Sequence, residues 1–572
     1  MDSISQPSQV KKSLFIVVFL LVIFFLAISV WYSPVLFKGY PAYTMTPNIP
    51  LARNLQQTGL YSVENDLNVF LSSNLLEEQG HLSAYGNKLT SLIYAQIFKI
   101  TGLLNENNLL LFSIILHALT LLIFTLIVLY LFGLKTGIVF SLVYIFLPIN
   151  WYLPYHLGVY EVALLFLACF FLLFFYGRKR KYDYFYLGFS GIFLALVCLA
   201  KEALLLIIPF LFIFLWLVKE KRYLIYVFIP WLILIGIFWL PDFSHNVYLK
   251  LFSTQASEDV KSADFASYGH LYPDPYTYHF EQENFLDNLQ QQINGRSLDL
   301  ISRLETKKTL ANQGVKSIDL VDRTTLGLVL FFKHIFRFAS LEDLGGPFVL
   351  LLMFLGAYGL RKKNKYLYRF FVYWIFSTIF LLSFLILASR SHLMDFNWAI
   401  ALLISLGLLT LIKVLVDYFK ISGRGVLIVS IIIILVGLYN FIIANHILWG
   451  RIYDDSNNLI AGVYSQEIEK ANISEEEVIA TALAPDYIYS LNYLTNKSMV
   501  IFHPETIESL LDKNELSSVF QKFKVKYILG YSEEITEKII NQTKVKNIAS
   551  SSFKLDISQL PRNKGWLMNL IK

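Results

Sequence analysis

Residues 13–32 read SLFIVVFLLVIFFLAISVWY, a run that contains no charged side chain. Because an α-helix rises about 1.5 Å per residue, about 20 apolar residues cross the hydrocarbon core of a bilayer, which is roughly 30 Å thick. Lys11 and Lys12 come directly before the run, and no small-residue cleavage site follows it. The stretch is therefore predicted to be a retained membrane anchor with its amino-terminal side in the cytoplasm.

The whole chain has the same apolar character. Of its 572 residues, 56% are hydrophobic and 16% are charged, whereas a typical soluble domain has about 25% charged residues. This deficit excludes an ordinary soluble enzyme. The net charge of +6 comes mostly from short basic clusters beside apolar runs, so it indicates membrane orientation and no nucleic-acid partner. Cys169 and Cys198 each lie inside an apolar run and are interpreted as small buried hydrophobes.

Further apolar runs follow along the chain. They lie near residues 107–133, 136–153, 157–177, 184–200, 202–218, 223–240, 347–361, 366–388, 395–416 and 425–447. We therefore predict a polytopic α-helical membrane protein with about eleven transmembrane helices, each close to the length that spans a bilayer.

The connections between these runs differ in charge. Basic clusters lie at alternate connections, at 178–181, 219–222, 361–365 and 420–424. Because basic residues are enriched on the cytoplasmic side of a membrane, these connections are predicted to be cytoplasmic. The large polar segments lie at the opposite connections, at 33–106, 241–346 and 448–572, and are predicted to be extracytoplasmic. The short amino-terminal tail and the absence of a retention signal favour a prokaryotic plasma membrane.

The last polar segment differs from the rest of the chain. Apolar stretches of strand length occur at 478–484, 499–502 and 526–529. Between the last two lies PETIESLLDKNELSSVFQKF at 504–523, which favours helix. Alternating short strands and helices are typical of an α/β domain with parallel strand pairs. We therefore predict a transmembrane domain over 1–447 and a small extracytoplasmic α/β domain over 448–572.

Four places carry ionisable residues inside or at the mouth of a predicted span, all on the side opposite to the basic clusters. They are Glu161 with His156 and Tyr160, Lys201 with Glu202, Lys88, and Arg390 with His392. Such residues mark functional interiors, because inserting a charged side chain at the centre of a membrane helix costs about 2.5–3.5 kcal/mol. One outward-facing cavity could hold an anionic lipid phosphate with the basic groups while a carboxylate takes a proton from a hydroxyl group.

The same residues also fit a purely structural interpretation. Lys201 and Glu202 would neutralise each other at a hairpin, and the side chains of Lys88 and Arg390 would extend to the lipid headgroups. Their shared side of the membrane favours the functional interpretation. We find no nucleotide-binding loop and no metal-ligand pattern, and we expect neither a cofactor nor a metal.

Several segments, in this order along the chain, resemble a known enzyme family. They are IPLARNLQQTGLYS at 49–62, NKLTSLIYAQIFKITG at 87–102, YEVALLFLACFF at 160–171, LALVCLAKEALLLIIPFL at 194–211 and SRSHLMDFNWAIALLISLGLL at 389–409. They are similar to segments of the membrane glycosyltransferases of the GT-C fold. The likeness is greatest to the group of protein O-mannosyltransferases and the lipid A aminoarabinose transferase, of the glycosyltransferase family 39 type. The last segment lacks the proline that the family has there.

The resemblance implies a polyprenyl-phosphate sugar donor and inversion at the anomeric carbon. It also implies roles for individual residues. Lys88, Lys201 and Arg390 would bind the donor phosphate, and Glu161 would position or deprotonate the acceptor. The residues beside them, His156, Tyr160, Glu202 and His392, would contact substrate.

One departure from the family pattern concerns its catalytic aspartate, which precedes the alanine of the first-loop helix by eight positions. Counting back from Ala52 gives Thr44, so no acid occupies that place. The base has then moved to Glu64 or Asp66, or the role rests on Glu161, or the protein no longer catalyses transfer. Glu64 and Asp66 also fit a solvated turn.

We therefore expect an integral membrane glycosyltransferase of the cell envelope. Its partners would be a polyprenyl-phosphate sugar, membrane lipid, and a lipid, glycan or protein acceptor on the outer face. A transporter or flippase of lipid-linked glycan is an alternative, since intramembrane charges fit that class as well. A non-catalytic glycan-binding protein is another, because no acid stands at Thr44. The aromatic stretch SYGHLYPDPYTYHF at 267–280 suits sugar stacking, and it equally fits a helix rim at the membrane interface.

Overall fold

The structure is a computed structural model of the chain, and the statements below concern the parts that it describes. These are residues 8–32, 52–53, 55–56, 88–101, 106–147, 150, 159–179, 183–201, 204–205, 207–252, 320–337, 346–386, 397–420, 425, 439, 464–474, 477–483, 491, 495, 497, 499–502, 504–522 and 524–550.

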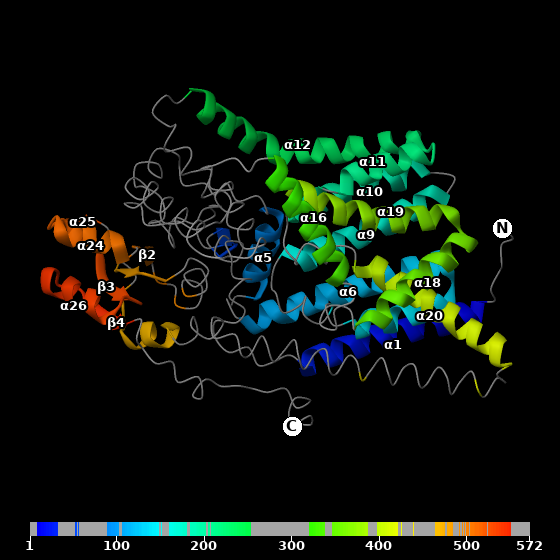
Figure 1. The fold of residues 1–572 in the computed structure, drawn as a ribbon, viewed down its shortest axis with the longest axis horizontal. Helices are drawn as coiled ribbons and strands as arrows, with labels where there is room; N and C mark the ends of the chain where they lie inside the picture. Colours follow the sequence, from blue (N-terminus) through cyan, green and yellow to red (C-terminus); the bar gives the residue numbers. More distant parts are fainter. Residues whose placement is uncertain are drawn as a thin grey trace.

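Most of the described residues form a bundle of helices (Figure 1). The helices are α1 Ser8–Tyr32, α5 Lys88–Thr101, α6 Glu106–Phe132, α7 Leu134–Phe146, α9 Val159–Lys179, α10 Asp183–Ala200, α11 Ile207–Leu217, α12 Lys221–Phe252, α16 Leu320–Arg337, α18 Pro347–Lys363, α19 Lys365–Leu381 and α20 Asn397–Phe419. Each predicted apolar run coincides with one of them except 425–447, which lies almost entirely outside the described residues.

Five described helices are long and apolar enough to cross a membrane. The apolar stretches are Leu111–Phe132, Tyr160–Arg178, Asp183–Ala200, Lys365–Phe384 and Asn397–Phe419. Shorter apolar stretches occur in α1, α7, α11, α12 and α16. A mostly helical structure with candidate membrane spans is therefore confirmed, whereas the full number of spans and their orientation stay predictions.

Two helices lie inside segments that we expected to be outer loops. The 14-residue α5 falls within 33–106, and the 18-residue α16 falls within 241–346. Both were missed because each places polar residues among its apolar ones, so neither forms a long apolar run. In addition, α12 continues to Phe252, beyond the predicted end at residue 240.

Aromatic rings fill the centre of the bundle. Trp398 of α20 stacks on Phe124 of α6, with ring centroids 4.7 Å apart and an angle of 13° between the planes. It also lies 5.1 Å from Phe171 of α9 and 5.6 Å from Trp374 of α19. These side chains are buried, so one apolar cluster joins four helices.

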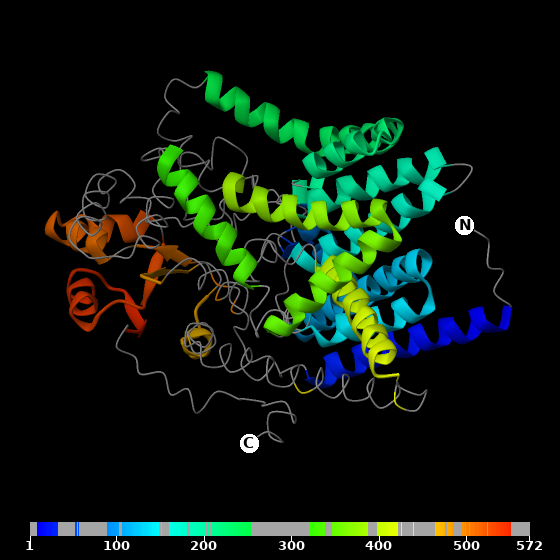
Figure 2. The ribbon, with the colours of Figure 1, turned by 45° about the vertical axis from the view of Figure 1, so that its right-hand side comes forward.

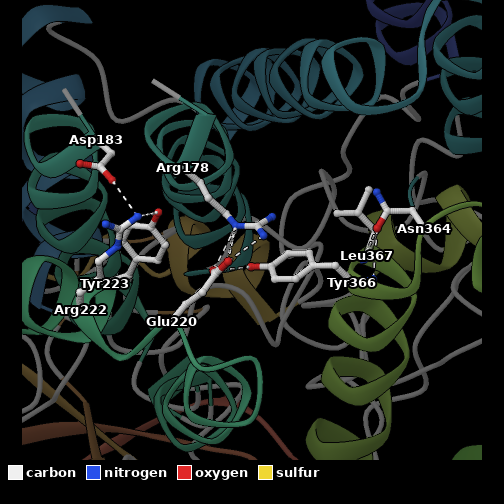
Figure 3. A network of polar contacts seen from close by, with 8 residues as sticks. All are labelled: Arg178, Asp183, Glu220, Arg222, Tyr223, Asn364, Tyr366 and Leu367. Atoms are coloured by element: carbon white, nitrogen blue, oxygen red, sulfur yellow. Dashed lines mark hydrogen bonds and ion pairs between the residues drawn. The ribbon is translucent and has the colours of Figure 1, made fainter. Parts of the chain in front are cut away.

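A polar network ties three helix connections at one end of the bundle (Figure 3). Arg178, near the end of α9, donates from Nε to both carboxylate oxygens of Glu220, at 3.2 and 3.1 Å, and from a terminal nitrogen at 2.8 Å. Glu220 lies between α11 and α12, and it also accepts a hydrogen bond from the Tyr366 hydroxyl at 3.3 Å. The Arg178 guanidinium lies over the Tyr366 ring, 3.4 Å from its centroid. The sequence predicts that this end faces the cytoplasm.

The described part of 448–572 contains a parallel four-stranded sheet. The strands β1 Val478–Thr481, β2 Met499–Ile501, β3 Val525–Leu529 and β4 Lys546–Ala549 occur in the order β2-β1-β3-β4. The helices α24 Pro504–Asp512, α25 Leu516–Lys522 and α26 Glu533–Gln542 connect or follow them. In both ribbon views the sheet lies beyond one end of the helical bundle (Figures 1 and 2). The predicted strands and their parallel pairing are confirmed, β4 was not predicted, and the boundary at 447 stays a prediction.

Candidate functional site

Glu161 lies in the first turn of α9 and is fully buried. Its carboxylate is within electrostatic range of the phenol groups of Tyr94 on α5 and Tyr144 on α7. The charge of Glu161 on α9 therefore acts on side chains of α5 and α7. The position at a helix amino terminus suits a negative charge, because the backbone N–H groups there have no partner within the helix.

Lys201 directly follows α10, and its backbone N–H donates to the Val197 carbonyl oxygen at 2.9 Å. The residue is 3% exposed. Its Nζ lies 3.7 Å from the centroid of the Tyr160 ring, which is the usual geometry of a cation–π contact. The structure thus brings Tyr160, Glu161 and Lys201 together at one end of the hairpin that α9 and α10 form.

The start of α5 docks at the same place. Thr90 Oγ1 donates to the carbonyl oxygen of Ala200 at 3.0 Å, and Thr90 is buried. Lys88 is the first residue of α5, two positions before Thr90, although its side chain lies outside the described part. The backbone of Lys88 is therefore close to the end of α10, where Lys201 lies.

The other predicted site residues lie outside the described residues. They are Glu64, Asp66, His156, Glu202, Arg390 and His392, and Thr44 lies outside as well. Their roles, like those of Glu161, Lys201 and Tyr160, stay predictions. Asn397 begins α20 immediately after the segment 387–396 that carries Arg390 and His392.

Two buried residues were not among the predicted site residues. Arg53 is fully buried, and it belongs to the segment 49–62 whose resemblance we noted. His117 of α6 is fully buried between the rings of Phe25 and Tyr144, at centroid distances of 5.5 and 5.6 Å. An ionisable residue inside an apolar run was the available signal for His117, because such residues are rare in membrane helices.

Among the described residues, no group of three or more His, Cys, Asp or Glu side chains lies close enough together to hold a metal ion. The side chains that the structure describes at this site are therefore a buried carboxylate, a buried ammonium group and three tyrosines. Such a set can hold an anionic group and accept a proton.

No protein-family model matches the chain, and no curated protein matches it. Solved structures do match the chain. The oligosaccharyltransferase of Archaeoglobus fulgidus, tethered to an acceptor peptide containing the NVT sequon, matches with a TM-score of 0.52 and 13% identity. The match covers 89% of this chain and 68% of that chain.

A second structure of this archaeal enzyme contains an inhibitory peptide and a dolichol-phosphate. It matches with a TM-score of 0.51 and 13% identity, over 89% of this chain and 69% of that chain. Identity this low shows the fold alone. The chain therefore has a fold like that of an archaeal oligosaccharyltransferase, which is a membrane glycosyltransferase of the GT-C fold.

Proposed function

We propose that the protein is an integral membrane glycosyltransferase. It transfers a sugar from a polyprenyl-phosphate donor to a lipid, glycan or protein acceptor on the extracytoplasmic face. The observation that carries the proposal is that a buried carboxylate, Glu161, and a buried ammonium group, Lys201, lie at one end of a GT-C-like bundle. Family membership of the glycosyltransferase 39 type belongs to the proposal as well.

The proposed reaction is a single displacement. An acceptor hydroxyl oxygen attacks the anomeric carbon of the donor sugar, and the bond from that carbon to the phosphate oxygen breaks. Glu161 takes the hydroxyl proton, and the product leaves as polyprenyl phosphate with the bonding electron pair. Because one displacement occurs and no covalent glycosyl-enzyme forms, the configuration at the anomeric carbon inverts.

The leaving phosphate gains negative charge during this step, so nearby cations stabilise the transition state. Lys201 is proposed to supply one of them, together with Lys88 and Arg390. Lys201 is nearly excluded from water, which strengthens its attraction to a phosphate. His156, Tyr160, Glu202 and His392 are proposed to contact the donor sugar or the acceptor.

Known ligands of the archaeal structures support the proposed substrate class. Those structures contain an acceptor peptide and a dolichol-phosphate, which is a polyprenyl-type phosphate. A lipid phosphate bound near Lys201 would have to compete with the Tyr160 ring for the ammonium group. We therefore propose that donor binding displaces this ring contact.

The test measures release of free polyprenyl phosphate from a panel of polyprenyl-phosphate sugars, with crude membrane as acceptor. The wild-type protein in detergent is compared with Glu161→Gln, which keeps the shape of the side chain and removes the base. Glu534→Gln is the matched control, because Glu534 is exposed on α26 in the carboxyl-terminal sheet domain. Release by the wild type and the control, together with loss in Glu161→Gln, is the expected result.

Other outcomes favour other functions. Full release by Glu161→Gln assigns the base to Glu64 or Asp66, and the corresponding Gln and Asn variants decide between them. No release with any donor, in protein that still binds the donor, favours a glycan-binding role. Movement of unaltered lipid-linked sugar across a reconstituted bilayer favours a flippase.

A further inference from the structure

The helix α16 has one packed side and one exposed apolar side. On the packed side, Leu326, Leu330 and His334 are at most 7% exposed. On the exposed side lie four large apolar side chains that are 47–74% exposed, namely Val321, Leu328, Phe332 and Phe336. Their spacing of seven and then four residues places them in one strip along the helix, because an α-helix has about 3.6 residues per turn. A continuous exposed apolar strip of this kind marks a contact surface.

The packed side of α16 is held against α19 and against the π-helix η4, Leu382–Ile386, which continues α19 (Figure 2). The Phe331 ring lies 5.9 Å from the ring of Phe376 on α19 and 6.2 Å from that of Phe384 on η4. Gly327 lets the two helices approach closely, since a Cβ atom there would lie 2.5 Å from a ring carbon of Phe384. These contacts fix which side of α16 is left exposed.

The exposed side of α16 continues the exposed surface of a candidate membrane span. That span is Lys365–Phe384, which contains α19. Phe376 and Phe380 of α19 are 59% and 46% exposed, as expected for side chains that face lipid. Phe331, which contacts Phe376, also lies 5.9 Å from the exposed ring of Phe332. Ring contacts therefore run without interruption from the surface that the span would present to lipid onto the exposed side of α16.

The apolar part of α16 fits one leaflet of a bilayer. It covers Thr324–Phe336, which is about 20 Å long, whereas the hydrocarbon core is roughly 30 Å thick. Thr325 lies among the exposed apolar residues, and its hydroxyl donates to the Val321 carbonyl oxygen at 2.8 Å, so it needs no water as a partner. The contacts with α19 and η4 lie toward the end of the span that is opposite to Lys365. Because the connection at Lys365 is predicted to be cytoplasmic, the leaflet is the extracytoplasmic one.

We propose that α16 docks into the extracytoplasmic leaflet of the membrane, with Leu328, Phe332 and Phe336 among the lipid acyl chains. Lys333 is exposed on the flank of this strip, from which its long side chain reaches the lipid headgroups. The docking is additional to the proposed sugar transfer and does not depend on it. It ties the segment 241–346, which the sequence alone assigns to an outer loop, to the bilayer at α16.

Spin labels in nanodiscs of phosphatidylcholine and phosphatidylglycerol test what surrounds the exposed side. The native thiols are removed with Cys169→Ala and Cys198→Ala, and Phe332→Cys then introduces one labelling site. Oxygen concentrates among acyl chains, whereas a polar nickel chelate stays in water, so the ratio of the two collision rates identifies lipid. We expect this ratio at position 332 to be several-fold higher than for Ser518→Cys, the matched control at an exposed position on α25. Phe380→Cys on the α19 span is the lipid reference and should give a ratio similar to that at position 332.

Three results would overturn the docking of α16 in lipid. A nickel collision rate at position 332 equal to that at position 518 means that the exposed side lies in water. Low collision rates with both reagents mean that protein covers it, either a second copy of the chain or another segment of the same chain. A water-like ratio at position 380 removes the lipid-facing surface that α16 is inferred to continue. Because no sugar transfer is measured, failure of the proposed function leaves this test unaffected.

A second measurement uses the wild-type protein, so it does not depend on whether the variants fold. A lipid-soluble aryl diazirine in the same nanodiscs inserts, on illumination, into side chains that face the acyl chains. Trypsin then cleaves after Arg323 and Lys333 and releases the α16 peptide 324–333. We expect label in this peptide and none in the peptide 514–522 of the sheet domain. An unlabelled 324–333 peptide, together with label in the α19 peptide 370–390, would show that α16 does not enter the leaflet.

Discussion

The ammonium nitrogen of Lys201 lies 3.7 Å from the centroid of the Tyr160 ring, which joins the end of α10 to the first turn of α9. The contact holds a nearly buried cation against Tyr160, the residue that precedes the buried acid Glu161 in the sequence. A buried cation loses the water that stabilises it in solution. The face of the Tyr160 ring offsets part of that loss. The ring therefore stabilises both the fold and the charge that the proposed reaction uses.

Tyr160→Leu is expected to lower the stability of the protein. It removes the aromatic face from the Lys201 ammonium, a contact worth about 1–2 kcal/mol when it is shielded from water. Tyr160→Phe keeps the ring and is expected to retain a Tm near that of the wild type. Thermal unfolding of the detergent-solubilised protein measures both variants, and equal Tm values for Leu and Phe would contradict the prediction.

Lys201→Met tests the charge itself. Methionine keeps an unbranched side chain and removes the cation that is proposed to offset the leaving phosphate. We expect kcat/KM for donor turnover to fall about a hundredfold or more, as for removal of other electrostatic stabilisers. Lys538→Met, at an exposed position on α26, is the matched control and should leave turnover unchanged. Equal losses in the two variants would exclude a specific role for Lys201.

The crossing of α18 and α20 depends on two glycines. A Cβ atom at Gly356 would overlap the Leu403 carbonyl oxygen, and one at Gly407 would overlap the Leu352 carbonyl oxygen. Gly356→Ala and Gly407→Ala therefore force the backbones apart, and each is expected to destabilise the protein by about 1–3 kcal/mol.

Gly236→Ala on α12 provides the control for this pair, since a Cβ there meets no other atom within 4 Å. Alanine is the better helix former, so this change is expected to leave Tm unchanged or slightly higher. Thermal unfolding compares the three variants. A Tm for Gly356→Ala equal to that of Gly236→Ala would mean that the two helices separate without cost.

Arg178 is expected to be the most sensitive member of the network in Figure 3. It donates three hydrogen bonds to Glu220 and also lies over the Tyr366 ring. Arg178→Met removes all of these contacts, with an expected loss of about 1–3 kcal/mol for a partly buried charged hydrogen-bond group. Tyr366→Phe removes one longer bond of 3.3 Å and should cost less. Tm values in the opposite order would contradict this ranking.

The exposed pair Glu534 and Lys538 gives a pH-dependent prediction. Lys538 donates a hydrogen bond to Glu534 at 2.8 Å, which lowers the pKa of Glu534, and the same contact raises the pKa of Lys538. The contribution of this carboxylate is therefore present above the ordinary glutamate pKa and is lost as the pH falls through the lowered pKa. Lys538→Met should raise the pKa of Glu534.

Carboxyl carbon NMR of the full chain, with Glu534→Gln to assign the signal, measures this shift. The Tm of Lys538→Met at neutral pH is expected to stay that of the wild type, because both side chains are exposed. A Glu534 titration that does not respond to Lys538→Met would show that the pair does not form in solution.

Hydropathy predicted the helices that carry apolar residues on all sides. Runs such as 107–133 and 395–416 became α6 and α20 because an uninterrupted apolar run long enough to cross a bilayer has few other stable structures. It did not predict α5 or α16, where apolar and polar residues share one helix. Nor did it predict β4, whose four residues begin with Lys546 and Asn547 and show no apolar run.

Three of the residues proposed for the site lie at one end of the α9–α10 hairpin, and their roles stay predictions. Glu161, Tyr160 and Lys201 were chosen because they interrupt or border apolar runs, and the alternation of basic connections placed them on one side. Arg53 and His117 were not chosen, because burial depends on packing against residues distant in the sequence. No pattern in either segment shows that the Arg53 side chain is fully buried or that the His117 ring lies between Phe25 and Tyr144.

The sequence by itself determined that this chain has helices long and apolar enough to span a membrane and a small parallel sheet, because run length, charge and alternation are local properties. Only the tertiary structure decided which side chains meet: Tyr160 with Lys201, Arg178 with Glu220, and Asn150 with Asn397. These contacts join residues up to 247 positions apart. They depend on distances and angles between packed helices, which no local pattern of residues encodes.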